Sequence, residues 1–391
     1  MSKTQPFAAD QVASLFTPFA IKQVVLANRF VMPAMQRGRC EQGAPLPALA
    51  DYYRRRVLGG VSLVIGESCA VDHPSATAQP MAARLTRETA PAWQRCVEAV
   101  KQAGGHMLLQ LWHEGALRRN DDGLTVSPSG IAYPALTQGR AASDRELTEI
   151  RDAFVSSALL AKSIGADGIE LHGAHGYLLD QFLWAATNIR TDGYGGSQIE
   201  HRVRFPAEIV QEIRKACGPG FLISVRFSQW KEHAYEARIV ETQAELQTMT
   251  QLLRSAGADV LHVSTRRFWT PEWPGSERTM AGWTRELSGL PTITVGSVGL
   301  DKDVMDSFTT AGEARSRVPE SLLELARRFS VGEFDLVSVG RSLISDPDWV
   351  NKVRVGDLQS IRSFLRRDID YLEWDGVPRE PPAPQAAEKD R

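Results

Sequence analysis

The sequence predicts a single-domain α/β protein, a closed (β/α)8 barrel of the TIM type. Three observations favour this fold: a length of 391 residues, eight short apolar runs along the chain, and a helix-like segment between successive runs. Strands that alternate with helices form a parallel sheet, and eight such units close into a barrel. The sequence contains neither GxGxxG nor GxxxxGK(S/T), which disfavours an open dinucleotide-binding sheet.

Eight runs rich in Val, Ile and Leu give the expected strands. Apolar character at successive positions fits strands that are covered on both faces. In chain order the runs are RFVMPAM (29–35), VSLVIGES (61–68), HMLLQLWH (106–113), GIELHGAH (168–175), FLISVRFS (221–228), VLHVSTR (260–266), TITVGSV (292–298) and FDLVSVGR (334–341).

The segments between the runs carry helix signals. Ser143 and Glu146 have the spacing of a capping box. The apolar residues that follow at helical spacing are Leu147, Ile150, Phe154, Ala158 and Ala161. Residues 301–330 form a longer connection between the last two runs, and we expect a helix in its SLLELARRF segment. The charged, Pro-rich tail at 376–391 is expected to be disordered.

Composition and charge favour a small-molecule protein. Hydrophobic residues make up 43% and charged residues 24% of the chain, which excludes disordered, collagen-like and membrane proteins as whole-chain classes. Lys and Arg total 45 against 47 Asp and Glu, a net charge of −2, so we expect no nucleic-acid or membrane partner. The N-terminal MSKTQPFAADQ lacks the apolar core of a signal peptide. We therefore expect a cytoplasmic protein.

The four cysteines are Cys40, Cys69, Cys96 and Cys217, and no CxxC pair occurs. This spacing disfavours zinc ribbons, iron–sulfur clusters and a disulfide framework. We expect reduced thiols packed in the core.

The last two runs end in glycine-rich turns. In a parallel barrel the active site lies at the carboxyl ends of the strands, so the polar residues that close each run are the candidates. VGSVG (295–299) and VGR (339–341) end these runs. Their glycines let backbone N–H groups approach an anion, and Arg341 can bind it. This pattern favours a phosphate site, although the glycines can also serve only to make tight turns.

Two runs enclose a large polar side chain, Gln110 in LLQLW and Arg226 in ISVRFS. An unpaired buried donor or charge is costly. A bound ring with carbonyl and imide groups would satisfy both side chains, and the guanidinium would stabilise negative charge that develops on the ring. The alternative for Arg226 is a buried salt bridge to Glu170 or another barrel carboxylate.

The fourth run carries the richest cluster of polar residues, with Glu170, His172, His175 and Tyr177 inside GIELHGAHGYLLDQFL. Strand alternation places Glu170 and His172 on one face, which we expect to be the barrel interior. The histidines offer two N–H donors for a substrate oxygen, and the phenol of Tyr177 offers a proton.

A metal-dependent hydrolase is the rival interpretation of the same cluster. Its ligands would be Glu170, His172 and His175, with His113 or His262 completing the set. The sequence lacks an obvious complete ligand set. Our main expectation is therefore that the site holds no metal.

Taken together, the motifs resemble the Old Yellow Enzyme family, the NADH:flavin oxidoreductases, over about residues 14–375. HGAHGYLLDQFL, TDGYGGS, VRFS, VGSVG and VGR follow the family's order, and QLWHEG is similar to its third-strand signature. The resemblance implies a barrel that binds FMN tightly but not covalently and takes hydride from NADH or NADPH. The family passes that hydride from flavin N5 to an activated alkene such as an α,β-unsaturated carbonyl. One site serves both substrates in turn, a ping-pong scheme that fits the missing GxGxxG.

The resemblance also implies roles for individual residues of this chain. The residues that match flavin-ring positions are Ala34, Met35, Ser68, Gln110 and Arg226. Those that match the phosphate site are Gly296, Ser297, Gly340 and Arg341. His172 and His175 match the pair that hydrogen-bonds the substrate carbonyl, and Tyr177 matches the proton donor.

Some features depart from the family pattern or leave its details open. Gln36 stands where the family commonly has a Thr or Cys that contacts the flavin. Its longer amide can still donate a hydrogen bond, so Gln36 remains a cofactor-binding candidate. Among the aromatic residues near the expected mouth, we expect Trp112 and either Phe268 or Trp269 to contact substrate. The loop 264–284 is a candidate lid, and its arginines are candidates to meet nucleotide phosphates. Oxidation of an amine or another substrate by the same cofactor is the alternative reaction, and we expect a monomer or a homodimer.

Overall fold

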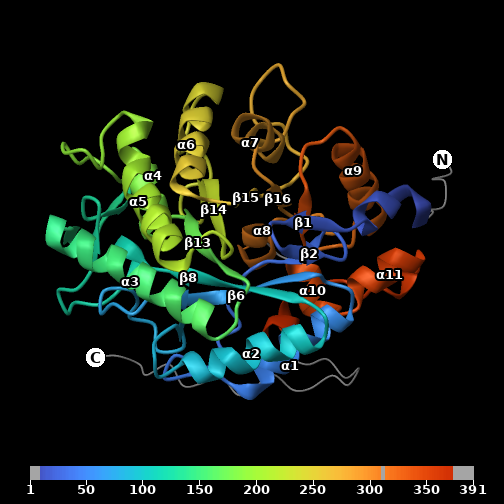
Figure 1. Cartoon of the computed structure of the whole chain (residues 1–391). Coiled ribbons are helices and arrows are strands. Elements are labelled where there is room, and N and C mark those ends of the chain that lie inside the picture. The colour runs from blue at the N-terminus through green and yellow to red at the C-terminus, as the bar shows by residue number, and fades with distance from the viewer. Residues whose placement is uncertain (1–8, 310–312, 373–391) are drawn as a thin grey trace.

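Eight parallel strands close into a barrel in the computed structural model, which describes residues 9–309 and 313–372 (Figure 1). Each strand lies within or overlaps one of the predicted runs. The strands are β3 (Phe30–Met32), β6 (Leu63–Ala70), β8 (His106–Trp112), β13 (Gly168–His175), β14 (Leu222–Lys231), β15 (Val260–Ser264), β16 (Thr292–Val295) and β17 (Leu336–Ser338). Neighbouring strands pair in this order, and β17 and β6 both pair with β3. The predicted (β/α)8 fold is confirmed.

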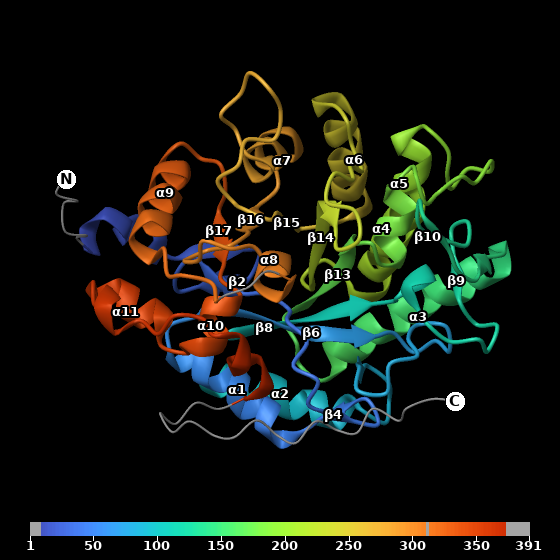
Figure 2. The same ribbon diagram turned by 180° about the vertical axis from the view of Figure 1, so that it is seen from behind.

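Helices surround the strands on all sides, as Figures 1 and 2 show from opposite directions. They are α1 (Pro47–Leu58), α2 (Ala90–Gln102), α3 (Asp144–Ser163), α4 (Leu178–Leu183), α5 (Ile199–Cys217), α6 (Gln243–Ala256), α7 (Met280–Ser288), α8 (Val304–Thr309), α9 (Val318–Ser330), α10 (Arg341–Ser345) and α11 (Trp349–Val355). The capping box of α3 is present, because Ser143 accepts from the backbone N–H of Glu146, whose carboxylate accepts from the Ser143 N–H in return. The helix expected in SLLELARRF is α9.

The amino end of the barrel is closed by an apolar cluster. The hairpin of β1 (Phe19–Ile21) and β2 (Val24–Leu26) supplies Ile21, Val24 and Leu26 to it. Inward-facing strand residues complete the cluster, among them Val31, Leu63, Leu108, Leu222, Val260, Ile293 and Leu336. Buried polar residues therefore concentrate toward the carboxyl ends of the strands, where the candidate site lies.

Short strands and 3₁₀ turns decorate the loops. The small strands are β4 (Cys40–Glu41), β5 (Ala44–Pro45), β7 (Ala83–Arg84), β9 (Val126–Ser127), β10 (Ile131–Tyr133), β11 (Leu136–Thr137) and β12 (Arg140–Ala141). The 3₁₀ turns are η1 (Ala9–Phe16), η2 (Gly115–Leu117), η3 (Leu358–Ser360) and η4 (Arg366–Asp370). β9 lies against α4, and Figure 2 labels both.

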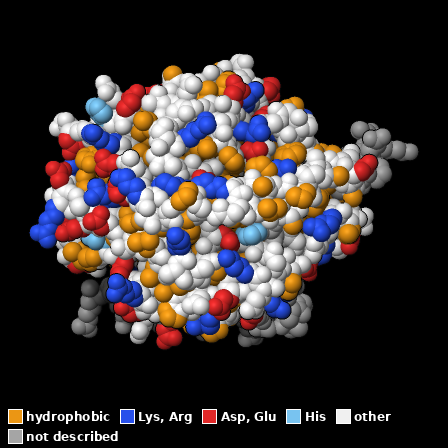
Figure 3. Space-filling view, in the orientation of Figure 1, with side chains coloured by type: hydrophobic (Ala, Val, Ile, Leu, Met, Phe, Trp, Pro, Cys, Tyr) orange, Lys and Arg blue, Asp and Glu red, His pale blue; other side chains and the backbone are white. Residues whose placement is uncertain are grey.

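All four cysteines are buried and free, as the sequence predicts. The surface in Figure 3 intersperses positive and negative side chains. A helix long and apolar enough to cross a membrane is not found in the described part of the chain. The predicted tail at 376–391 and the predicted end of the barrel domain at residue 375 lie outside the described residues.

Candidate active site

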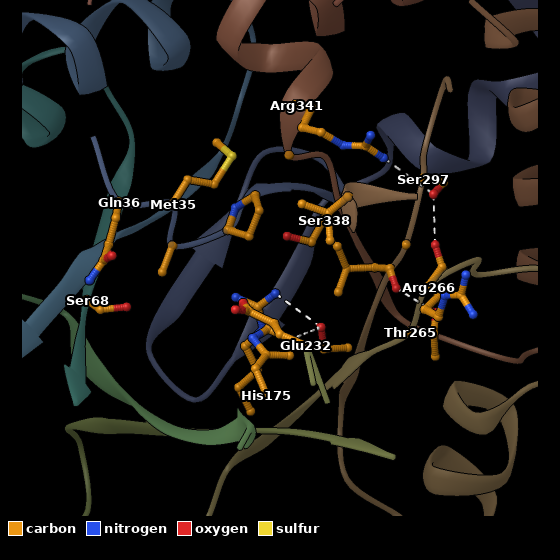
Figure 4. A pocket seen from close by; sticks show the side chains of 18 of the residues that line it. Met35, Gln36, Ser68, His175, Glu232, Thr265, Arg266, Ser297, Ser338 and Arg341 are labelled. Carbon is orange, nitrogen blue, oxygen red and sulfur yellow. Dashed lines mark hydrogen bonds between the residues drawn. The ribbon is translucent and has the colours of Figure 1, made fainter. Parts of the chain in front are cut away.

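A cavity of about 380 Å³ opens at the carboxyl ends of the barrel strands (Figure 4). Figure 4 shows Met35, Gln36 and Ser68 on one side of it and Ser297 and Arg341 on the other. The structure brings together in its lining Ala34, Met35, Gln36, Ser68, Gln110, His172, His175, Tyr177, Arg226, Gly296, Ser297, Gly340 and Arg341. These are all the cofactor and catalytic candidates selected from the sequence.

Strand register builds a polar network beneath the cavity. Glu170 lies opposite Gln110 on β8 and Ser224 on β14. Its carboxylate accepts hydrogen bonds from Gln110 Nε2 at 2.8 Å, Ser224 Oγ at 2.9 Å and His262 Nδ1 at 2.8 Å. Burial raises the pKa of Glu170, but His262, Arg226 and these hydrogen bonds outweigh it and bring the pKa to about 2. Glu170 is therefore ionised at neutral pH.

The same network changes the expectation for Gln110. Its amide oxygen accepts from Ser68 Oγ, and its amide nitrogen donates to Glu170. The side chain is therefore anchored by the protein on both sides, and a bound ring is not needed to satisfy it. Anchoring fixes the orientation of the amide that faces the cavity.

Arg226 keeps part of its guanidinium free of protein partners. It does not form the alternative salt bridge with Glu170, which lies within hydrogen-bonding distance of His262 instead. Nη2 donates to Ser264 Oγ at 3.2 Å, whereas the buried Nε has no hydrogen-bond partner among the described residues. Burial lowers the pKa of Arg226, although the charge of Glu170 opposes that shift. The result is a buried cation with a donor available to an acceptor in the cavity.

His172, His175 and Tyr177 pack edge to face around one point of the cavity. The ring centroid of His172 lies 5.2 Å from that of His175 and 4.9 Å from that of Tyr177. Burial, followed by the charge of Arg226, lowers the pKa of His172 to about 3 and that of His175 well below its ordinary value. Burial and the nearby charges of Glu232 and Glu114 raise the pKa of Tyr177. At neutral pH the imidazoles are neutral and the phenol keeps its proton.

The turn that carries His175 and Tyr177 is held by a buried ion pair that sequence reasoning missed. His175 has φ of +65°, and its N–H donates to Ser228 Oγ at 3.0 Å. The next N–H, of Gly176, donates to Asp180 Oδ2 at 2.6 Å. The other oxygen of Asp180 lies 2.9 Å from Lys231 Nζ, and both side chains are buried. The pair links α4 to β14 and so fixes the turn between them.

Ser264 is a second residue that the sequence analysis did not select. Its hydroxyl lies 2.8 Å from His175 Nε2 and accepts from Arg226. Its backbone carbonyl accepts from Trp230 Nε1 at 3.2 Å. Strand alternation could have identified it, because Ser264 follows the inward-facing His262 by two residues on the same strand.

The expected substrate contacts Trp112, Phe268 and Trp269 are not among the residues that line the cavity. Trp112 is only 1% exposed and packs edge to face against Tyr177, with centroids 5.3 Å apart. Phe268 and Trp269 pack against each other at 5.1 Å. Trp230, which the sequence analysis did not favour, lines the cavity together with Tyr177, and its ring lies 4.9 Å from that of His175.

The phosphate candidates lie at the opposite end of the cavity. Gly296 has φ of +151°, and a Cβ there would come within 2.5 Å of the Thr265 carbonyl oxygen, so the position requires glycine. Arg341 donates to the carbonyls of Lys302 at 2.6 Å and Asp303 at 2.9 Å. Burial lowers the pKa of Arg341 to about 10, although nearby carboxylates oppose this shift. The guanidinium is positioned by the loop before α8.

The arginines of the loop 264–284 are paired with carboxylates. Arg266 lies 2.5 Å from Asp303, and Arg267 lies 3.1 Å from Asp306. These contacts tie the loop to the segment around α8. They give the two arginines protein partners where we expected nucleotide phosphates.

The residues of the rival metal site do not form a ligand cluster in the described part of the chain. Glu170 contacts His262, whereas His113 Nε2 lies 2.8 Å from Ser75 Oγ. Within residues 9–309 and 313–372, no group of three or more His, Cys, Asp or Glu side chains could hold a metal ion. The ligand set that a hydrolase would need is not assembled in this part of the chain.

Buried neutral histidines predict loss of stability in acid. Burial lowers the pKa of His113 and of His172 to about 3, below the value of about 6.5 in an unfolded chain. As pH falls from 6.5 toward 3, the unfolded state binds protons that the folded state does not. Each histidine should then lower the free energy of unfolding by up to about 1.4 kcal/mol per pH unit.

Guanidinium unfolding at pH 7.5, 6 and 5 measures this effect. His113→Gln should give a shallower decline than the wild type, because it removes one of the buried histidines whose pKa is lowered. Equal stability at pH 7.5 and pH 5 would contradict the neutral state of these histidines.

Comparisons with known proteins agree on one family. A sequence model described as the NADH:flavin oxidoreductase / NADH oxidase family matches residues 14–329. NADH oxidase of Thermoanaerobacter brockii is 35% identical over 375 residues, 92% of this chain and 53% of that protein. This chain therefore spans about half the length of that relative. 12-Oxophytodienoate reductase 7 of Oryza sativa subsp. japonica is 30% identical over 380 residues, 91% of each chain.

Solved structures give the same result. Morphinone reductase in complex with tetrahydroNAD matches with a TM-score of 0.74 and 25% sequence identity. The match covers 91% of this chain and 94% of that one. The likeness therefore extends over the whole barrel.

Proposed function

Because the chain belongs to the NADH:flavin oxidoreductase / NADH oxidase family, we propose that it reduces the C=C bond of α,β-unsaturated carbonyls or similarly activated alkenes. FMN is its cofactor and a reduced nicotinamide nucleotide its reductant. The observation that carries the proposal is the convergence of His172, His175 and Tyr177 on the cavity that also holds Arg226. Two similar proteins, 12-oxophytodienoate reductase 7 and morphinone reductase, are named as reductases, which supports a reductase activity.

The residues that line the cavity fit FMN. Arg226 Nε, His172 Nδ1 and Ser338 Oγ are buried without hydrogen-bond partners among the residues described, and buried polar groups ordinarily have partners. Arg226 and Gln110 would hold the flavin ring, and Ala34, Met35 and Ser68 would lie along it. Gly296, Ser297, Gly340 and Arg341 would hold the phosphate. When bound, FMN supplies the group that accepts and returns hydride.

The histidines would act on the substrate carbonyl. Each neutral imidazole can donate one N–H, so His172 and His175 together can bind one carbonyl oxygen. These donors would stabilise the negative charge that develops on the oxygen as the double bond is reduced. The Ser264 hydroxyl and the Ser228 hydroxyl keep His175 in place.

Tyr177 would supply the proton to the carbon beside the carbonyl. Its phenol keeps the proton at neutral pH, and its ring is held between His172 and Trp112. A proton donor at this position favours alkene reduction over the alternative oxidation of an amine. Because both substrates would occupy this cavity in turn, we expect ping-pong kinetics. A cytoplasmic location and a monomeric or homodimeric state remain predictions from the sequence.

Product analysis tests the proposed reaction. The FMN-loaded protein, supplied with NADH or NADPH and cyclohex-2-enone, should form cyclohexanone in proportion to the nucleotide consumed. Nucleotide oxidation without saturated product, under anaerobic conditions, would contradict the proposal.

Gln36 should tune the flavin potential. It lines the cavity after Met35 and is exposed there, at the position where the family commonly has a shorter Thr or Cys. We expect Gln36→Thr to shift the potential by tens of millivolts, because hydrogen bonds near a cofactor tune its electronics. Spectroelectrochemistry measures the shift, and an unchanged potential would exclude Gln36 from this role.

A further inference from the structure

Glu232 is the only carboxylate among the described residues that line the cavity. It follows β14 directly, and Figure 4 shows it at the same end as His175. It shares the cavity lining with Tyr177, the proposed proton donor, and its charge raises the pKa of that phenol. The carboxylate therefore belongs to the substrate end of the cavity, away from Arg341 and Ser297.

The basic side chain next to Glu232 in the chain and those in the cavity lining make their protein contacts with groups other than Glu232. Lys231 is paired with Asp180 and donates to the carbonyls of Ser228 and Gln229. Arg226 donates to Ser264, and Arg266 is paired with Asp303. No described Lys, Arg or His approaches Glu232 closely enough to form one of the ion pairs found in the structure, all of which are within 4.0 Å.

An unpaired carboxylate in the wall of a cavity is an incomplete interaction. Glu232 is partly buried, and burial raises its pKa with no opposing contribution from a neighbouring charge. Desolvating a charge is costly unless a partner compensates. A positive charge on the bound substrate would provide that partner, whereas a negative charge would be repelled.

We propose that Glu232 makes the cavity selective for activated alkenes that carry a positive charge, and selective against those that carry a carboxylate. This inference rests on the proposed alkene reduction and adds a substrate class to it. The carboxylate binds the charged substituent, while His172 and His175 bind the carbonyl oxygen. Selectivity therefore arises from two groups at one end of the same cavity.

Three maleimides that carry an N-ethyl substituent ending in a cationic, neutral or anionic group test the proposal. N-[2-(trimethylammonio)ethyl]maleimide is permanently cationic, N-(2-hydroxyethyl)maleimide is neutral and N-(2-carboxyethyl)maleimide is anionic at pH 7. The FMN-loaded wild type should show kcat/KM in the order cation, neutral, anion. Glu232→Gln keeps the shape and removes the charge, so the ratio of cation to anion should fall by at least about tenfold. The neutral compound is the reference for both ratios, because any change in its kcat/KM reports an effect on the reaction step and not on charge recognition.

Glu236→Gln is the matched control. Glu236 lies on the same loop and is exposed, and it does not line the cavity. This variant removes the same charge from the loop, so it reports general electrostatic steering. Its ratio of cation to anion should stay at the wild-type value. An equal fall in both variants would overturn the inference, because it would place the selectivity in the overall field.

Binding separates this inference from the proposed reaction. Calorimetry with the corresponding saturated succinimides requires no turnover, and the cationic one should bind more weakly to Glu232→Gln than to the wild type. If no maleimide is reduced but this difference appears, the proposed reaction fails and the role of Glu232 stands. If the neutral maleimide is reduced and the ratio is the same in wild type and Glu232→Gln, the reaction stands and the inference is wrong.

Discussion

Replacing Tyr177 with Phe is expected to lower the rate of alkene reduction by about a hundred- to ten-thousand-fold. The phenol is the proposed proton donor, and its ring packs against His172 and Trp112. Phenylalanine preserves that packing and removes only the hydroxyl. Reduction of the flavin by NADH or NADPH does not need this proton, so it should continue at nearly the wild-type rate. Stopped-flow measurement of the two half-reactions separates the effects.

Tyr133→Phe is the matched control for this experiment. Tyr133 stacks on His233 in the loops outside the cavity lining, with centroids 5.1 Å apart. Loss of its hydroxyl should leave both half-reactions unchanged. If Tyr177→Phe slows both half-reactions equally, Tyr177 is not the proton donor.

Lys231→Met is expected to lower the free energy of unfolding by about 3–5 kcal/mol. Lys231 and Asp180 form an ion pair at 2.9 Å whose side chains are at most 2% exposed. Removal of the lysine leaves the Asp180 carboxylate buried without its counter-charge. Denaturant unfolding measures the loss. Because the pair holds the turn of His175 and Tyr177, activity at low temperature should fall as well.

Two variants make this prediction specific. Lys215→Met breaks an exposed pair with Glu212 on α5, and surface pairs contribute only about 0–1 kcal/mol. In Asp180→Asn/Lys231→Met, the Asn can still accept from the Gly176 N–H and carries no charge. The double variant should therefore be more stable than Lys231→Met alone. If Lys231→Met is as stable as Lys215→Met, the account of the buried pair is contradicted.

Much of the cavity follows from strand alternation. The rule that inward-facing residues recur at every second position places Glu170 and His172 inside the barrel, and the structure has both there. Gln110 and Arg226 are selected by a different rule, because each is a large polar side chain inside an apolar run, where an unpaired group is costly. The predictions for Glu170 and His172 succeed because the face of a strand is a local property of the sequence.

Contacts between loops were harder to predict. Alternation does not show that Trp112 packs against Tyr177 and does not line the cavity, because that contact depends on the turn after β13. The partner of Lys231 is Asp180, 51 positions earlier in the chain by their numbers. The partner of Arg266 is Asp303, in the longer connection before α9. Such pairs depend on the conformation of loops. Loops have no repeating pattern of buried and exposed residues from which their contacts could be predicted.

An anaerobic absorption titration of the purified protein tests the central claim most directly. Flavin bands should be present, should bleach when NADH or NADPH is added, and should return when cyclohex-2-enone follows. That sequence of changes is the result expected of an FMN-dependent alkene reductase, and it identifies the preferred nucleotide. Absence of flavin bands even after added FMN, or bleached bands that no activated alkene restores, would contradict the account.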